Sequence, residues 1–101
     1  MALIEVSIIP LGTETPSLSQ YIAQAVKVLE EEKDIKYQLT AMGTIIEGDL
    51  EQLLTLVRKM HQAVLDSGVM RVATTMKIDD RRDKTASMNT KMDSLKRKLG
   101  H

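Results

Sequence analysis

The chain of 101 residues has no cysteine, no tryptophan and no phenylalanine, and its only aromatic residues are Tyr21 and Tyr37. Without cysteine it cannot form a disulfide, a thiolate metal site or a cysteine nucleophile. Two aromatic rings are too few for RNA-type base stacking or for an aromatic cage around a cation. The side chains left for chemistry are therefore carboxylates, hydroxyls, amides, basic groups and two histidines.

The chain also lacks net charge and long apolar runs. Lysine plus arginine and aspartate plus glutamate number 14 each, so no overall field favours nucleic acid or an anionic membrane. No apolar run approaches the roughly 20 residues of a membrane span, and Glu5 interrupts the only apolar run near the N-terminus, which argues against a signal peptide. We expect one cytoplasmic domain over residues 1–101, with no nucleic-acid or membrane partner.

Apolar and polar residues alternate in four segments, which predicts four strands. In the first segment Ile4, Val6 and Ile8 share one face, while Glu5 and Ser7 lie on the other. A carboxylate in an apolar strand is costly unless it faces water, a partner or a ligand. The expected strands cover residues 2–11, 35–41, 44–47 and 70–79, with a turn at Met42 and Gly43.

Three segments have the periodicity of amphipathic helices. Ser17 with Gln20, and Asp49 with Gln52, have the spacing of N-terminal caps, and Gly68 is typical of a helix stop. The expected helices cover residues 18–33, 50–67 and 87–99. Their expected apolar stripes are Leu18, Ile22, Ala25, Val26 and Leu29; Leu53, Leu54, Val57, His61, Val64 and Leu65; and Met88, Met92, Leu95 and Leu99.

The element order is βαββαβ followed by α, which predicts an α+β, ferredoxin-like sandwich with an additional C-terminal helix. Right-handed crossovers would place the first two helices on one face of the sheet and leave the other face bare. A face of mixed polar and apolar residues usually meets another subunit or a ligand. We therefore expect a homo-oligomer, most simply a dimer packed sheet to sheet. The bare face would carry Leu3, Glu5, Ser7, Ile9, Gln38, Thr40, Glu47, Thr75 and Lys77.

Three segments together resemble the small thiamine-binding-protein family, which is related to the YkoF-type proteins that bind thiamine and its hydroxymethylpyrimidine part. They are residues 5–13 (EVSIIPLGT), 42–48 (MGTIIEG) and 77–83 (KIDDRRD). The resemblance covers essentially the whole chain. It implies a ferredoxin-like fold, dimers that assemble into a homotetramer, a cytoplasmic location and no established catalysis. It also implies thiamine or hydroxymethylpyrimidine as a ligand, with no other cofactor.

Thiamine offers an aminopyrimidine that forms hydrogen bonds and a permanently charged thiazolium, and a carboxylate can meet either. Glu5 is the strongest candidate because it lies in the middle of an expected central strand. The alternative is an inter-subunit ion pair with Lys77, expected on the neighbouring strand and the same face. Glu47 could neutralise the thiazolium, or it could be a first-turn charge that complements the dipole of the second helix.

Hydroxyl groups supply further candidates. Thr13 and Ser17 lie near the start of the first expected helix, where backbone N–H groups can hold a phosphate or hydroxyl, although capping is the commoner role for Ser17. Thr44 follows Gly43, where the backbone can be approached closely. The predicted ligand-binding residues are Glu5, Ser7, Thr13, Thr44, Glu47 and Lys77.

Neither histidine is in a pattern typical of a metal site. His61 falls on an apolar stripe, which favours a core histidine with one hydrogen-bonded nitrogen. The sequence thus predicts a non-enzymatic protein that binds thiamine or hydroxymethylpyrimidine as a carrier, buffer or sensor. Two alternatives stay open: a structural or regulatory module that binds a protein partner, and a small enzyme with Glu5 or His61 as its base.

Overall fold

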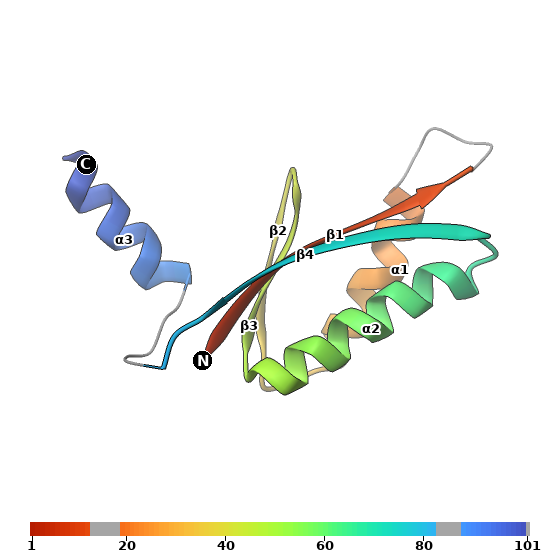
Figure 1. The fold of residues 1–101 in the computed structure, drawn as a ribbon, viewed down its shortest axis with the longest axis horizontal. Helices are drawn as coiled ribbons and strands as arrows, with labels where there is room; N and C mark the ends of the chain where they lie inside the picture. Colours follow the sequence, from red (N-terminus) through yellow and green to blue (C-terminus); the bar gives the residue numbers. More distant parts are fainter. Residues whose placement is uncertain (13–18, 83–87, 101) are drawn as a thin grey trace.

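A computed structural model describes residues 1–12, 19–82 and 88–100 of the chain (Figure 1). Its element order confirms the predicted α+β, ferredoxin-like fold with an extra C-terminal helix. Each strand begins and ends within one residue of its expected bounds. The elements are β1 (Ala2–Leu11), α1 (Ser19–Glu30), β2 (Lys36–Thr40), β3 (Gly43–Gly48), α2 (Leu50–Asp66), β4 (Arg71–Asp80) and α3 (Met88–Leu99).

The four strands form one antiparallel sheet in the order β2-β3-β1-β4. The central strand β1 pairs with β4 along its full length, from Ala2 opposite Asp80 to Leu11 opposite Arg71. Its pairing with β3 ends at Val6. Beyond Val6, β1 therefore has a strand on one side only among the residues that the structure describes.

Helices α1 and α2 contact each other and cover one face of the sheet, as the right-handed crossovers predict (Figure 1). The core lies between these helices and the strand residues that face them. No helix of the described part of the chain is long and apolar enough to cross a membrane. The buried core residues are Ala2, Ile4, Val6, Ala25, Leu29, Ile46, Leu53, Leu56, Val57, Met60 and Val64.

The buried stripe of α2 differs in part from the predicted one. Leu56 and Met60 are buried, whereas Leu54 is exposed. The stripe follows a spacing of three and four residues from Leu53, which places Leu54 at its edge. On α1, Ile22 is also exposed although it belongs to the expected stripe. Both helices therefore bury a narrower stripe than their apolar residues suggest.

Local hydrogen bonds explain where several elements begin and turn. The Asp49 carboxylate accepts a hydrogen bond from the Gln52 N–H at 3.3 Å, which confirms the predicted cap of α2. At the β2–β3 turn the Thr40 Oγ1 accepts hydrogen bonds from the N–H groups of Met42 and Gly43 at 3.2 and 3.1 Å. The predicted cap of α1, Ser17, lies outside the described residues.

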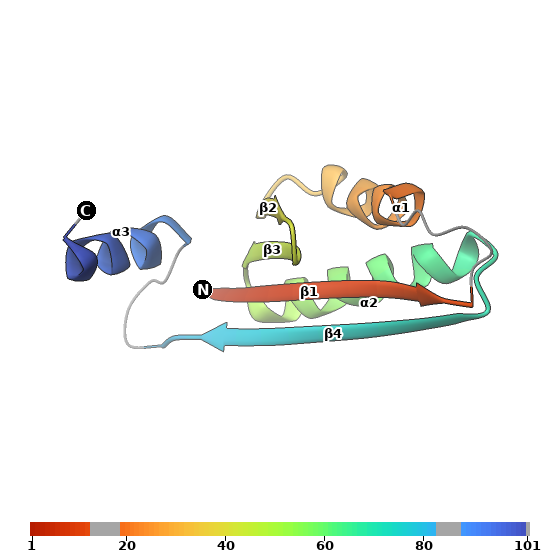
Figure 2. The ribbon, with the colours of Figure 1, turned by 90° about the horizontal axis from the view of Figure 1, so that it is seen from above.

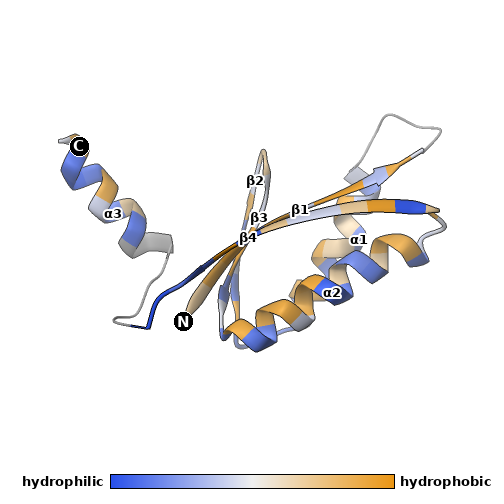
Figure 3. Ribbon diagram, in the orientation of Figure 1, coloured by the Kyte–Doolittle hydropathy of each residue, from blue (hydrophilic) through white to orange (hydrophobic). Residues whose placement is uncertain are grey.

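Helix α3 lies apart from α1 and α2, beyond the end of the sheet where β1 begins and β4 ends (Figures 1 and 2). Hydrophilic residues dominate it (Figure 3). The apolar side chains of Met92, Leu95 and Leu99 are exposed. These three residues of the predicted stripe are therefore exposed within one copy of the chain.

Candidate ligand site

The strand register separates the two faces of the sheet, because directly opposite residues of an antiparallel pair share a face. Glu5 lies opposite Ile45 on one side and Lys77 on the other. These residues lie on the face away from α1 and α2, as predicted. We call it the open face. Its residues include Leu3, Glu5, Ser7, Ile9, Lys36, Gln38, Thr40, Ile45, Glu47, Arg71, Ala73, Thr75, Lys77 and Asp79.

A cavity of about 460 Å³ crosses the open face, and we call it the open-face groove. Strand residues form its floor, and two residues of α3 stand at its end. It brings together two of the predicted ligand residues, Glu5 and Lys77. The groove is lined by Leu3, Glu5, Gln38, Thr40, Ile45, Lys77, Asp79, Lys91 and Met92.

Glu5 carries the chemistry of the groove. It lies in register with Lys77, yet the two side chains form no ion pair within one copy of the chain. Glu5 is exposed and has no hydrogen-bond or ion-pair partner among the residues that the structure describes. Its carboxylate is therefore available to accept hydrogen bonds from a ligand or to balance a positive charge.

The far end of the groove holds an ion pair between α3 and β4. Lys91 donates to the carboxylate of Asp79, and both side chains are partly exposed. This pair ties the start of α3 to the sheet. Because Asp79 is engaged in this way, Glu5 is the carboxylate of the groove that has no cationic partner among residues 1–12, 19–82 and 88–100.

Glu47 is on the open face too, opposite Leu3 and Lys36, but it does not line the groove. Its residue is 4% exposed, and it has no hydrogen-bond or ion-pair partner among the residues that the structure describes. No fully buried side-chain oxygen of that part of the chain lacks a partner, so the Glu47 oxygens still reach solvent. Such a carboxylate is costly to bury.

The alternative role for Glu47, a first-turn charge of the second helix, is wrong. Glu47 belongs to β3, and α2 begins at Leu50 after its cap Asp49. The acidic residue in the first turn is Glu51. The expected strand over residues 44–47 already contained Glu47, and the structure keeps it in the sheet.

The three predicted hydroxyl residues are not brought together with Glu5. Ser7 is half-buried on the open face but lines a different cavity. Thr44 is buried on the face that the helices cover, and lines that same cavity. Thr13 lies outside the described residues. The predicted set therefore divides between two places in the molecule.

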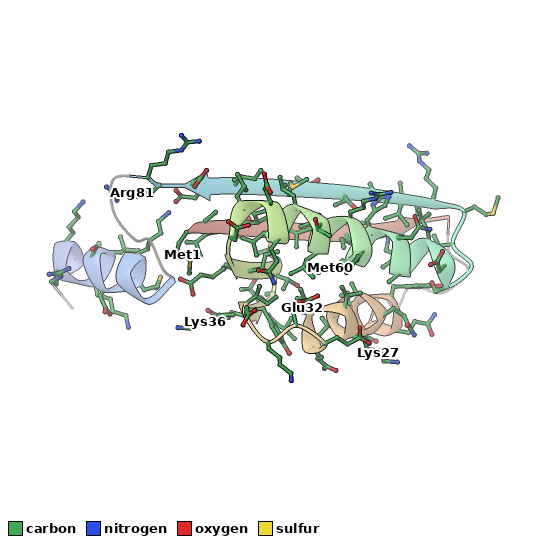
Figure 4. All side chains as sticks on the ribbon, turned by 90° about the horizontal axis from the view of Figure 1, so that it is seen from below. Met1, Lys27, Glu32, Lys36, Met60 and Arg81 are labelled. Carbon is green, nitrogen blue, oxygen red and sulfur yellow. The ribbon has the colours of Figure 1, made fainter. Side chains whose placement is uncertain are left out.

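The second cavity, also about 460 Å³, lies where β1 continues beyond the end of β3, and we call it the hairpin cavity. Met60 of α2, labelled in Figure 4, forms part of its wall. Sequence reasoning missed it, although the greater length of the first expected strand over the third could have indicated it. Its lining is Ser7, Ile8, Ile9, Ile22, Ala25, Leu39, Thr40, Ala41, Met42, Gly43, Thr44 and Met60.

His61 is part of the packing and lines neither cavity. Its Nδ1 lies 2.6 Å from the Thr74 Oγ1, and the pair is partly buried. This arrangement confirms the hydrogen-bonded nitrogen, while His61 itself lies at the edge of the core and not within it. Within the described ranges, no three histidine, aspartate or glutamate side chains are grouped as a metal ion would need.

Comparison with known proteins places the chain among named relatives. It is 48% identical over 102 residues to the UPF0045 protein YqgV of Bacillus subtilis, with 98% of each chain covered. It is 45% identical over 96 residues to a UPF0045 protein of Methanothermobacter thermautotrophicus, with 94% of this chain and 96% of the relative covered. Neither name is that of an enzyme.

Solved structures share the fold. The crystal structure of the hypothetical protein MJ1052 of Methanocaldococcus jannaschii matches with a TM-score of 0.85 and 39% identity, over 93% of this chain and 94% of that one. A Thermotoga maritima protein, named provisionally for thiamine biosynthesis or salvage, matches with a TM-score of 0.76. At 17% identity, over 93% of this chain and 97% of that one, it supports the fold alone. The family model described as thiamine-binding protein matches residues 4–96, and the chain therefore belongs to that family.

Proposed function

We propose that this chain is a non-enzymatic protein that binds thiamine, or its hydroxymethylpyrimidine moiety, in the open-face groove. The observation that carries the proposal is the Glu5 carboxylate, which lies in the groove without an ion-pair or hydrogen-bond partner among the described residues. Membership of the thiamine-binding protein family supports the choice of ligand. The protein would act as a carrier, a buffer or a sensor of that ligand.

The groove has suitable groups for both parts of thiamine. The Glu5 carboxylate can accept a hydrogen bond from the exocyclic amino group of the pyrimidine, and its charge also favours the thiazolium cation. Gln38 from β2 adds a neutral donor and acceptor, while Ile45 and Met92 provide apolar contact for the rings. A few polar groups in an otherwise apolar hollow are typical of small-molecule sites.

The size of the groove agrees with such a ligand. Its volume of about 460 Å³ falls within the range of about 300–1,000 Å³ that small-molecule pockets usually have. Lys77 borders the same space and could contact a phosphate on a phosphorylated form of the ligand. If the chain prefers the phosphorylated compounds, Lys77 contributes to their binding. If it prefers the unphosphorylated pyrimidine, binding depends on the charge of Glu5 alone.

The remaining candidate residues contribute in different degrees. Ser7 and Glu47 share the open face with Glu5 and are proposed as secondary contacts, Glu47 through the charge it adds near the groove. Thr44 lines the hairpin cavity and would contact a ligand only there. Thr13 stays a candidate because of its expected place near the start of the first helix, where backbone N–H groups can hold a phosphate or hydroxyl.

We also propose that the chain works in the cytoplasm as a homo-oligomer, in which open faces meet and dimers pair into tetramers. The support is the apolar surface left outside the core. Ile9 and Leu11 on the open face, and Met92 and Leu95 on α3, are all exposed. Covering them with a second copy would bury apolar surface that one copy leaves in water.

Isothermal titration calorimetry with thiamine, its phosphates and hydroxymethylpyrimidine tests the ligand proposal. Glu5→Gln keeps the size of the side chain and removes its charge, so we expect affinity to fall about tenfold or more. Glu30→Gln is the matched control, because Glu30 is exposed on α1 and far from the groove lining. Unchanged affinity in Glu5→Gln, or no binding to the native chain, would contradict the proposal.

A module that binds a protein partner is the second candidate function. The exposed stripe of α3 favours it, since Met92, Leu95 and Leu99 have no cover within one copy. A folded native oligomer that shows no heat with any of the compounds would support this alternative. An enzyme with His61 as base has less support, because the Thr74 hydroxyl already occupies one nitrogen of its ring.

A further inference from the structure

Strand β1 is longer than its partner β3, and this leaves part of one edge of β1 unpaired. The register with β3 ends at Val6 opposite Thr44, while the register with β4 continues to Leu11. Figure 2 shows β1 and β4 continuing beyond β3. The hairpin cavity lies along this stretch and is lined by residues of β1, the β2–β3 turn and both covering helices. An unpaired strand edge beside a cavity offers main-chain hydrogen bonds to a ligand.

The backbone groups of Ile8 are directed toward this cavity, which Ile8 lines. A Cβ built on Gly43 would lie 2.6 Å from the carbonyl oxygen of Val6, so that oxygen points toward β3. Backbone groups point to alternate sides along a strand, so the N–H and C=O of Ile8 lie on the same side as those of Val6. Neither group of Ile8 has a hydrogen-bond partner on that side among the described residues.

The unpaired edge is only one residue long. Ser7 and Ile9 direct their backbone groups the other way, into the pairing with β4. The next residue with groups on the cavity side is Pro10, which has no N–H to leave unpaired. Within residues 7–11 the edge therefore offers a single N–H, that of Ile8, together with the Ile8 carbonyl. One residue of an extended peptide presents the matching carbonyl and N–H.

A buried hydroxyl opens onto the same cavity. Thr44 is 7% exposed, and its side chain has no hydrogen-bond partner among the described residues. No fully buried side-chain oxygen of that part of the chain lacks a partner, so the Thr44 hydroxyl keeps accessible surface in the cavity that it lines. A buried hydroxyl without a partner is costly. It can donate a hydrogen bond to a ligand or accept one.

The remaining lining is apolar and carries no charge. Ile22 and Ala25 of α1 and Met60 of α2 line the cavity from the helices (Figure 4). None of its lining residues is acidic or basic. A charged ligand would therefore lose hydration there without meeting an opposite charge. The open-face groove, with Glu5 and Lys77, has the opposite character.

We infer that the hairpin cavity binds an extended, uncharged peptide segment of a partner protein through one apolar residue of that segment. The peptide residue opposite Ile8 donates its N–H to the Ile8 carbonyl and accepts a hydrogen bond from the Ile8 N–H. Opposite residues of antiparallel strands share a face, so its side chain lies on the face of Ile8, toward Ile22 and Met60. The peptide thus extends the pairing of β3 with β1 by one residue, which is recognition by strand addition.

This site is separate from the open-face groove and from the ligand proposed for it. Thr40 borders both hollows, but its hydroxyl already bonds within the β2–β3 turn. The thiazolium of thiamine would find no opposite charge in the hairpin cavity. A groove that fails to bind thiamine would leave the peptide proposal unaffected, and the reverse also holds.

Amide hydrogen exchange followed by NMR tests the unpaired edge before any ligand is added. We expect the Ile8 amide to exchange about tenfold faster or more than those of Ser7 and Ile9, which pair with β4. Equal protection of the three amides would overturn the proposal, because the Ile8 N–H would then already have a partner.

Titration of the ¹⁵N-labelled chain with a blocked alanyl-leucyl-alanine peptide tests the ligand class. We expect the amide signals of Ile8, Ile22 and Thr44 to shift, and exchange of the Ile8 amide to slow. Two matched peptides are the controls: one is methylated on the leucine nitrogen and lacks that donor, and one has aspartate in place of leucine. Each should bind about tenfold more weakly.

Three results of this titration would overturn the proposal. The first is equal affinity for the three peptides, and the second is a set of shifts confined to the open-face groove. The third is a shift of the Ile8 signal with hydroxymethylpyrimidine and not with the leucine peptide, which would assign the cavity to a small heterocycle.

A change in the cavity wall provides a test from the side of the protein. Ile22→Ala removes part of the apolar wall at an exposed position of α1, so we expect the dissociation constant of the leucine peptide to rise about fivefold. Leu54→Ala is the matched control, because Leu54 is also exposed and does not line the cavity. Circular dichroism shows whether both variants keep the native fold. Equal affinities of the two variants would contradict the proposal.

Discussion

The two faces of the sheet are made by the same strands and have opposite properties. On the face under α1 and α2, Ile4, Ile46 and Leu53 are fully buried in the core. On the open face, Glu5 is exposed and has no hydrogen-bond or ion-pair partner in the described part of the chain, and a groove of about 460 Å³ crosses the same strands. Packing on the covered face stabilises the fold, whereas charged groups on the open face are accessible to a ligand.

The difference comes from the connections and not from the strands alone. Both crossover helices pack on one face, and α3 reaches only one end of the other. Alternation along β1 then directs Ile4 and Val6 to the helices and Glu5 to the open side. Substitutions at even-numbered residues of β1, which face the helices, should therefore change stability. Substitutions at odd-numbered residues, which lie on the open face, should change binding.

The largest effect should come from opening a cavity under the helices. Leu53→Ala removes a fully buried side chain of α2, and we expect the free energy of unfolding to fall by about 3 kcal/mol. Urea denaturation measures the change. Leu95→Ala on α3 is the matched control, because Leu95 is 48% exposed and should cost less than about 0.5 kcal/mol. Equal losses of stability in the two variants would show that the core under α1 and α2 does not stabilise the fold more than α3 does.

A smaller loss should follow from Gly43→Ala at the start of β3. The new Cβ would approach the Val6 carbonyl oxygen to 2.6 Å, at a backbone φ of 156°. We expect destabilisation of about 2 kcal/mol. Gly12→Ala shares a positive φ, 72°, but meets nothing within 4 Å, so it should cost about 1 kcal/mol. A larger loss at Gly12 would argue against the close approach of β3 to β1.

Removing the polar contact between His61 of α2 and Thr74 of β4 should cost less again. Thr74→Val deletes the hydroxyl that lies 2.6 Å from the His61 Nδ1, with an expected loss of about 1 kcal/mol in thermal or urea unfolding. Thr55→Val serves as control, since the exposed Thr55 hydroxyl donates only to the Glu51 carbonyl of its own helix. If both variants lose the same stability, the His61–Thr74 contact adds nothing to the covered face.

The smallest effect is expected at the ion pair between α3 and the sheet. Lys91→Ala breaks its contact with Asp79, and both side chains are at least one-third exposed. Such pairs contribute about 0–1 kcal/mol, so global stability should hardly change. The amides of α3 should nevertheless exchange hydrogen faster in Lys91→Ala than in the native chain. The control is Lys59→Ala, which removes an exposed lysine of α2 and should leave exchange in α3 unchanged. Unchanged exchange would mean that other contacts hold α3.

Much of the fold could be predicted because local patterns decide it. Alternation indicated the strands and their faces, so Glu5 and Lys77 were correctly predicted to lie on neighbouring strands and on the same face. The cap at Asp49 followed from side-chain chemistry alone. The burial of Met60 and the exposure of Leu54 could not be predicted, because they depend on the angle at which α2 crosses the sheet.

The site was harder to predict because it depends on relative strand lengths and side-chain positions. Sequence reasoning placed Ser7 and Thr44 in one set with Glu5. In the structure the pairing of β1 with β3 stops at Val6, and a second cavity lies beyond it. Ser7 and Thr44 line that second cavity and not the groove of Glu5. The alternative role of Glu5, an inter-subunit ion pair with Lys77, stays a prediction, because it involves a second copy of the chain. Burial of Glu47 depends on long-range packing that no local pattern reports.

The central claim is that the open face is the face that binds a small molecule. Titration of the ¹⁵N-labelled chain with thiamine or hydroxymethylpyrimidine, followed by NMR, tests it most directly. One spectrum contains backbone amide signals from both faces of the sheet, so it shows which face the ligand contacts. We predict that the amide signals of Glu5, Gln38 and Lys77 shift, while those of Ile22 and Met42 in the hairpin cavity stay in place. Shifts confined to Ile22 and Met42, or no shifts at all, would contradict it.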